Sequence, residues 1–147
     1  MKWALIHVTN DLHFWKMDQD NWSAELKYNQ RAQTFRLAAG DKRLFFVERT
    51  GFLQSKFIVR TEYSQLIGEV HPGKNRRSGV ATIENKRFNY LLAEHLLQLS
   101  GKEGIISLAI DTNDITTLTT AELCALIFST LRVAGKQRVT EAQLEMA

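Results

Sequence analysis

The stretch TTAELCALIFSTL, from Thr119 to Leu131, decides how this chain can fold. It begins with a capping-box pattern, because Thr119 is followed three residues later by Glu122. Leucines and isoleucine form one helical stripe, and Cys124 and Phe128 lie on the opposite flank. A helix that is apolar on every side must be surrounded by protein or by lipid. The run is too short for a bilayer, which needs about 20 apolar residues, so we expect the rest of the chain to enclose it.

Length and composition indicate one globular domain followed by a short tail. The chain has 147 residues, of which 44% are hydrophobic and 24% charged, and its formal net charge is +3. We predict a helix over about 119–134, with Gly135 as its C-terminal cap. The globular domain then covers 1–136, and 137–147 is a polar tail that we expect to be frayed or weakly helical.

The chain before this helix has the pattern of short β-strands separated by polar turns. The run Lys56–Tyr63 alternates most clearly, because Phe57, Val59, Thr61 and Tyr63 share one face. The expected strands cover 25–28, 34–37, 43–48, 56–63, 66–70, 79–83, 87–92, 96–99 and 104–110. The leucine-rich segment 96–99 fits a short helix equally well.

Two arrangements accommodate many antiparallel strands and one wholly apolar helix. A curved sheet can close into a barrel whose interior the helix fills, which also removes exposed sheet edges. Alternatively, the helix lies across an open sheet and leaves one flank in water. Because the helix has few polar residues for that flank, we favour the first arrangement. The expected fold is mainly β: an antiparallel, curved or closed β-barrel-like sheet around or against a C-terminal hydrophobic helix.

Three segments between Leu66 and Tyr90 carry a resemblance to a known family. The segment Leu66-Ile67-Gly68-Glu69-Val70 is followed by a polar loop, then by Gly79-Val80-Ala81-Thr82-Ile83 and Lys86-Arg87-Phe88-Asn89-Tyr90. This order resembles tubby C-terminal-like and LURP-one-like domains, and phospholipid scramblases are similar in predicted architecture. The resemblance covers roughly Lys56 to Lys136 and implies a closed antiparallel barrel threaded by a hydrophobic helix. Members that bind phosphoinositides use basic residues on the barrel wall.

The strongest functional candidate in the residues themselves is a basic cluster. Lys74, Arg76, Arg77, Lys86 and Arg87 fall within fourteen positions and are opposed only by Glu84. If 79–83 and 87–92 form a hairpin, these charges converge on one rim, where they could attract anionic phospholipid headgroups or bind phosphates. The alternative is a solvated loop that charge keeps soluble. Nucleic acid is a less favoured partner, because no recognised motif accompanies the modest net charge.

Catalytic and metal-binding patterns have little support, so we expect no enzyme, no cofactor and no metal. The histidines are scattered without a His-Glu-x-x-His pattern, and no nucleophile elbow or dinucleotide fingerprint is present. His13 lies near Asp11, Asp18 and Asp20, which leaves a metal site open, although its aromatic neighbours favour a structural role. The alternative is a small enzyme with an unrecognised polar pocket, which a histidine beside a carboxylate in a large cavity would support.

The remaining distinctive residues favour a packed intracellular domain. Trp3, Trp15 and Trp22 either pack into the barrel wall or form a membrane-facing or partner-facing patch. Cys124 is the only cysteine and is expected to be a small buried hydrophobe. Without a targeting signal at the N-terminus, we expect a cytoplasmic protein that can be peripheral to a membrane. The hypothesis is a non-enzymatic binding or scaffold domain for an anionic ligand, with a protein-interaction subunit as a further alternative.

Overall fold

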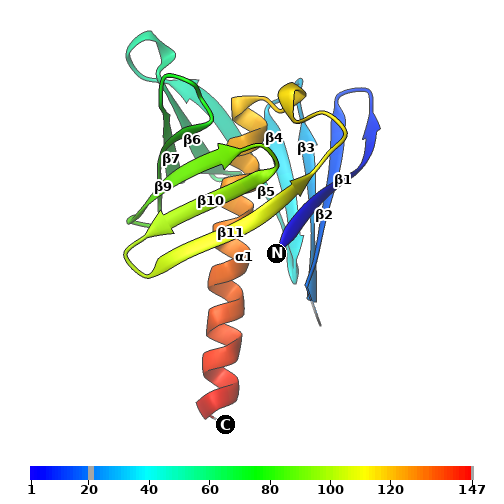
Figure 1. The fold of residues 1–147 in the computed structure, drawn as a ribbon, viewed down its shortest axis with the longest axis vertical. Coiled ribbons are helices and arrows are strands. Elements are labelled where there is room, and N and C mark those ends of the chain that lie inside the picture. The colour runs from blue at the N-terminus through cyan, green and yellow to red at the C-terminus, as the bar shows by residue number, and fades with distance from the viewer. Residues whose placement is uncertain (20–21, 147) are drawn as a thin grey trace.

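The computed structural model shows a closed β-barrel wrapped around an α-helix (Figure 1). It describes residues 1–19 and 22–146, apart from the side chains of residues 22, 54 and 136–146. Asp20 and the side chain of Trp22, both named above, lie outside the described part of the chain. The elements are β1 (Lys2–Thr9), β2 (Leu12–Gln19), β3 (Trp22–Asn29), β4 (Thr34–Ala39), β5 (Asp41–Thr50), η1 (Phe52–Gln54), β6 (Lys56–Thr61), β7 (Leu66–Pro72), β8 (Ser78–Ile83), β9 (Lys86–Ala93), β10 (Leu96–Gly101), β11 (Gly104–Asp111), η2 (Ile115–Thr117) and α1 (Thr120–Met146).

Eleven strands within the described residues close the barrel, each pairing with the next along the chain. These consecutive pairs are antiparallel. Closure comes from a short parallel pair, in which Lys2–Ala4 of β1 lie opposite Ala109–Asp111 of β11. Because successive strands reverse direction, their loops gather at two ends. We call the end at which α1 begins the upper end, and the end from which it leaves the barrel the lower end (Figure 1).

The barrel interior is filled by inward-facing strand residues and by the first half of α1. Helix residues 121–130 are all buried. Phe128 lies between two strands, with its ring centroid 5.7 Å from that of Phe35 and 4.8 Å from that of Phe45. Alternation along strands such as β4, β5, β9 and β10 supplies such inward residues at every second position. The predicted β-barrel around an apolar helix is therefore confirmed.

The two tryptophans with described side chains belong to this core. Trp3 and Trp15 are buried, and each indole donates a hydrogen bond to a polar atom of α1. The Nε1 of Trp3 lies 2.9 Å from the hydroxyl of Thr130, and that of Trp15 lies 2.7 Å from a carboxylate oxygen of Glu122. A buried indole N–H needs such a partner. The wall-packing interpretation is thus confirmed for these two residues.

The helix is longer than the sequence predicts. It continues to Met146 rather than ending near Gly135, and Figure 1 shows its lower part projecting beyond the barrel. Gly135 is not among the glycines with a positive φ, so it does not form the left-handed cap that we expected. Glycine inside a helix costs only about 1 kcal/mol, which the long packed segment before it can offset. The predicted helix boundary at 134 is therefore wrong, and residues 137–146, which we expected to be frayed or weakly helical, continue the helix.

The nine predicted strands, from 25–28 to 104–110, are confirmed, but the first two strands of the barrel were not predicted. Each predicted segment overlaps one strand of β3 to β11, and 96–99 lies in strand β10 rather than in a helix. The N-terminal patterns did not indicate β1 and β2. Tyr63 lies beyond the end of β6 and is 83% exposed, so the prediction that it shares one strand face with Phe57 is wrong.

Cys124 offers a direct test of the enclosed helix. The residue is a free cysteine and is fully buried, and that burial raises the pKa of its thiol far above the usual range. Because the thiolate is the reactive form, we expect the native protein to react very slowly with a disulfide reagent such as Ellman's reagent at pH 8. Unfolding in urea should expose one reactive thiol. Equal rates for native and unfolded protein would contradict the enclosed position.

Candidate functional site

The structure separates the predicted basic cluster into two groups. Lys74, Arg76 and Arg77 lie on the β7–β8 loop at the upper end, whereas Lys86 and Arg87 begin β9 at the lower end. The six residues of β8 lie between them, which is about 20 Å of extended chain. The prediction that all five charges converge on one rim is therefore wrong. Each group has to be considered with the residues at its own end.

At the upper end, the β7–β8 loop is held in a fixed conformation. Asn75 accepts hydrogen bonds through Oδ1 from the backbone N–H groups of Arg77 and Ser78, at 3.1 and 3.2 Å. The guanidinium of Arg77 donates to the carbonyl of Ile115, 3.2 Å away. Lys74 and Arg76 are exposed, and neither forms an ion pair with a residue that the structure describes. Their charges are therefore available to a ligand.

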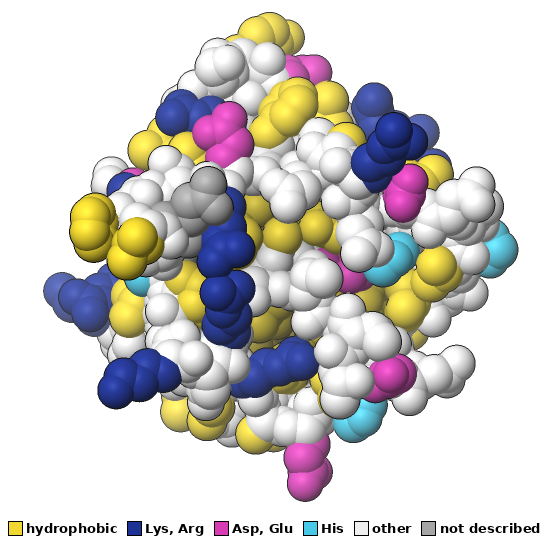
Figure 2. Space-filling model, turned by 90° about the horizontal axis from the view of Figure 1, so that it is seen from above, with side chains coloured by type: hydrophobic (Ala, Val, Ile, Leu, Met, Phe, Trp, Pro, Cys, Tyr) yellow, Lys and Arg dark blue, Asp and Glu magenta, His cyan; other side chains and the backbone are white. Residues whose placement is uncertain are grey.

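The neighbouring loop at the upper end carries an apolar tip. Phe52 and Leu53, which we call the apolar tip, lie between β5 and β6 and are 85% and 83% exposed. Because β5, β6, β7 and β8 are successive neighbours in the barrel, the β5–β6 and β7–β8 loops protrude from the same end. Figure 2, seen from above, shows Lys and Arg side chains gathered in a row across this end. The upper end thus combines exposed cations with an exposed apolar projection.

A buried carboxylate lies beside the start of α1. Glu122 is 2% exposed, and its oxygens accept from His13 Nδ1 at 2.8 and 3.0 Å and from Trp15 Nε1 at 2.7 Å. Thr119 caps the helix as predicted, because its hydroxyl oxygen accepts from the backbone N–H of Glu122 at 3.2 Å. The Glu122 side chain, however, contacts the barrel wall instead of completing the capping box. This contact fixes the start of the helix against β2.

The surroundings of Glu122 form a small hollow of about 270 Å³. His13 and Trp15 contribute to its wall, together with the loop that precedes α1. Tyr28 lies close by, with its ring centroid 6.0 Å from that of His13. Burial raises the pKa of Tyr28 to about 12, and the charge of Glu122 acts in the same direction. The phenol therefore stays protonated over the physiological range.

The His13–Glu122 pair can hold the imidazole in one tautomer. A carboxylate that accepts from Nδ1–H leaves Nε2 free to act as a base or a ligand. Among the described residues, no hydroxyl or thiol is hydrogen-bonded to His13. No group of three or more metal-ligating side chains gathers within that same part of the chain. His13 therefore contacts Glu122 rather than Asp11 or Asp18, the two described aspartates of those considered from the sequence. The geometry indicates a structural tether.

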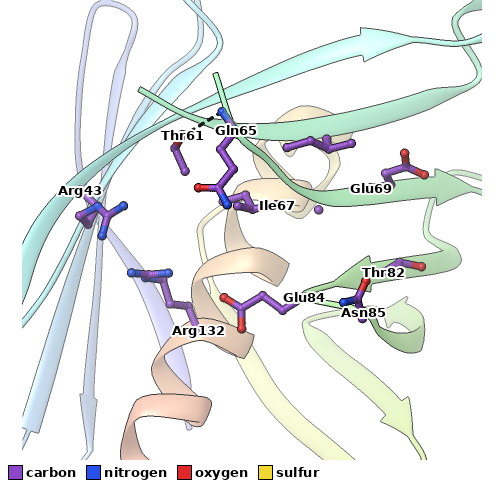
Figure 3. A pocket seen from close by; sticks show the side chains of 11 residues that line it. Arg43, Thr61, Gln65, Ile67, Glu69, Thr82, Glu84, Asn85 and Arg132 are labelled. Carbon is purple, nitrogen blue, oxygen red and sulfur yellow. Dashed lines mark hydrogen bonds between the residues drawn. The ribbon is translucent and has the colours of Figure 1, made fainter. Parts of the chain in front are cut away.

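The lower end has its own hollow, of about 520 Å³, beside the departing helix. Arg43 of β5 and Arg132 of α1 both line it, as does Glu84 from the β8–β9 turn (Figure 3). Lys86 lies near this end but pairs with Glu103 at 3.8 Å. Neither Lys86 nor Arg87 lines the hollow. The arginines that do line it lie far from the predicted cluster in sequence.

The sequence patterns missed three groups of residues at these ends. Phe52 and Leu53 follow Gly51 in a turn, and an apolar pair in a turn is a signal that could have been used. The meeting of His13 with Glu122 joins residues 109 positions apart. Arg43 and Arg132 line the same hollow only because the barrel is closed around the helix. No local pattern indicates either pair.

Comparisons with protein families, with curated protein sequences and with solved structures find no match for this chain. The resemblance to tubby C-terminal-like and LURP-one-like domains therefore stays a prediction. Over the described residues, α1 is not apolar for long enough to span a bilayer.

Proposed function

We propose that this chain is a non-enzymatic binding domain that docks on anionic phospholipid surfaces through its upper end. The observation that carries the proposal is the apolar tip beside the exposed cations of the β7–β8 loop. The helix-filled interior supports a surface site rather than an internal one, because residues 121–130 of α1 occupy the barrel. Of the five residues considered from the sequence, Lys74, Arg76 and Arg77 then face the membrane.

The two parts of this surface would contribute to binding in different ways. A basic residue near an anionic leaflet contributes about 1 kcal/mol, so three cations supply roughly 3 kcal/mol. Burying a Phe or Leu side chain supplies roughly another 1.5–3 kcal/mol each. Neither contribution alone holds a domain on a membrane after the entropic cost of association. Together they would give reversible, salt-sensitive attachment, as expected of a cytoplasmic protein that is peripheral to the membrane.

Flotation with vesicles tests this proposal. We expect the wild-type chain to float with vesicles that contain phosphatidylserine and to stay in solution with pure phosphatidylcholine. Lys74→Gln/Arg76→Asn should lower the floated fraction severalfold, because two unpaired cations are removed. Asparagine is chosen for position 76, where φ is +60°, because it tolerates left-handed backbone. Phe52→Ser/Leu53→Asn should lower flotation without changing the charge.

The matched control is Lys86→Gln/Arg87→Gln. It removes the same charge from the lower end and should float like the wild type. If this control loses as much flotation as Lys74→Gln/Arg76→Asn, net charge rather than the upper end determines binding and the proposal is wrong. Flotation of the wild type that does not depend on anionic lipid would also contradict it.

The enzyme alternative has one observation in its favour, which is the His13–Glu122 pair in a hollow. It would make His13 a general base, as the orientation of its ring by a carboxylate allows. The hollow of about 270 Å³ lies at the small end of ligand sites, and the described residues supply no activated nucleophile beside it. We therefore place the binding domain first.

A further inference from the structure

We propose that the lower end holds a second binding site, for a small molecule that carries a phosphate or carboxylate group. Arg43 and Arg132 would bind the anionic group, and Glu84 would accept a hydrogen bond from a hydroxyl or amino group of the same molecule. The site lies at the opposite end of the barrel from the surface proposed for lipid. It is therefore independent of that proposal.

One hydrogen-bond donor of the Arg132 side chain has no acceptor in the folded chain. Its guanidinium carbon lies 5.5 Å from the ring centroid of Phe45, so the cation stacks on a core aromatic residue at the lower opening of the barrel. Its Nε atom is buried and has no hydrogen-bond partner. Among the described residues, no carboxylate forms an ion pair with it. A buried donor without a partner is costly, so an acceptor that enters the hollow would relieve that cost.

Arg43 places a second guanidinium at the same opening. It precedes the buried Phe45 by two residues on β5, and alternation therefore directs both side chains inward. It forms a salt bridge with Asp41, 4.0 Å between Nη1 and a carboxylate oxygen, and its side chain is 36% exposed, so the guanidinium also remains accessible from the hollow. Figure 3 shows the guanidinium groups of Arg43 and Arg132 on the same side of the hollow. An oxyanion that enters the hollow could accept charge-assisted hydrogen bonds from both guanidinium groups.

The rest of the lining favours a polar organic anion over a bare ion. Thr61, Gln65 and Asn85 add neutral hydrogen-bonding groups. In Figure 3 the carboxylate of Glu84 extends toward Arg132, yet it forms no ion pair with a described residue. Glu84 would weaken the binding of a ligand that offers only negative charge and would support one that also donates a hydrogen bond. The hollow of about 520 Å³ matches a molecule of metabolite size.

Binding titrations of the full chain, followed by NMR chemical shifts, test the site. The probes are inorganic phosphate, glycerol phosphate and glutamate, which separate phosphate from carboxylate and a bare ion from a ligand with donor groups. We expect at least one organic probe to bind saturably and more tightly than inorganic phosphate. Arg43→Gln should weaken that binding about tenfold or more, because it removes charge-assisted hydrogen bonds. Glu84→Gln should reduce the preference for the organic probe over inorganic phosphate.

Two controls keep this test decisive. Lys86→Gln/Arg87→Gln removes two charges near the same end but outside the hollow, and it should bind the probes like the wild type. Arg132→Gln should also weaken binding, but it uncovers Phe45, so Arg43→Gln carries the test if Arg132→Gln unfolds. Arg43→Gln should leave vesicle flotation unchanged, which separates this site from the upper end. The absence of saturable binding, or equal binding by wild type and Arg43→Gln, would overturn the proposal.

Discussion

Phe128→Ala is expected to lower the free energy of unfolding by about 3–5 kcal/mol, which is typical of a large buried side chain replaced by alanine. Phe128 is 1% exposed, and its ring contacts Phe35 and Phe45 on neighbouring strands. These strands are held in place by the closed hydrogen-bond ladder, so they cannot collapse into the space that the ring leaves. Because a domain of this kind is stable by only about 5–15 kcal/mol in total, the loss would be a large fraction. Urea unfolding followed by circular dichroism measures it.

The control for this variant is Phe52→Ala, which removes the same side chain from the exposed apolar tip. We expect its unfolding free energy to stay within about 0.5 kcal/mol of the wild type. Comparing the two variants therefore shows how much of the loss in unfolding free energy comes from the burial of the phenylalanine ring. A loss of less than about 1 kcal/mol for Phe128→Ala would mean that α1 does not form the core of the barrel.

The helix and its enclosure could be predicted because the necessary information is local. The run Thr119–Leu131 is apolar on every side, and that pattern alone requires surrounding protein. The N-terminal strands carry a weaker signal. In β1 the register shifts between Leu5 and His7, and Ile6 and Val8 are 61% and 51% exposed. A bulge breaks the period of two on which strand prediction depends, so β1 does not show the inside–outside alternation of a regular strand.

The candidate site was less predictable, because proximity in sequence is a poor guide to proximity across a barrel. Lys74 and Lys86 are twelve positions apart, yet a full strand separates their loops. Arg43 and Arg132 are far apart in sequence and line one hollow. Only the register of the closed sheet could have shown either relation, and register depends on long-range pairing that no local pattern contains.

The glycines that carry the family resemblance have a local packing reason. A Cβ atom added at Gly79 would clash with the carbonyl oxygen of His71, and one at Gly68 would lie 3.2 Å from a side-chain carbon of Ile83. Close packing of β7 and β8 therefore demands glycine at position 79, whereas a larger residue at position 68 would require the Ile83 side chain to shift slightly. The glycine pattern reports on how the strands pack, and it carries no information about a ligand. This is why the lipid proposal depends on the exposed residues of the upper end instead.

Glu122→Ala is expected to destabilise the chain by about 3 kcal/mol or more, because it leaves buried donors without their acceptor. The carboxylate accepts from Trp15 Nε1 at 2.7 Å and from His13 Nδ1 at 2.8 Å, and Trp15 is itself buried. Glu122→Gln keeps an oxygen acceptor of nearly the same shape, so it should cost less than Glu122→Ala in the same urea titration.

A double-mutant cycle with Trp15→Phe isolates the hydrogen bond to the indole. Trp15→Phe removes the indole N–H, so this donor is no longer left without an acceptor when Glu122 is replaced. Glu122→Ala should therefore lower the free energy of unfolding less in the Trp15→Phe background than in the wild type. The coupling free energy is expected to be about 1–2 kcal/mol. Equal costs in the two backgrounds would show that Glu122 does not stabilise the fold through Trp15. The hydrogen bond to His13 would then be the remaining reason for the buried carboxylate, as the enzyme alternative requires.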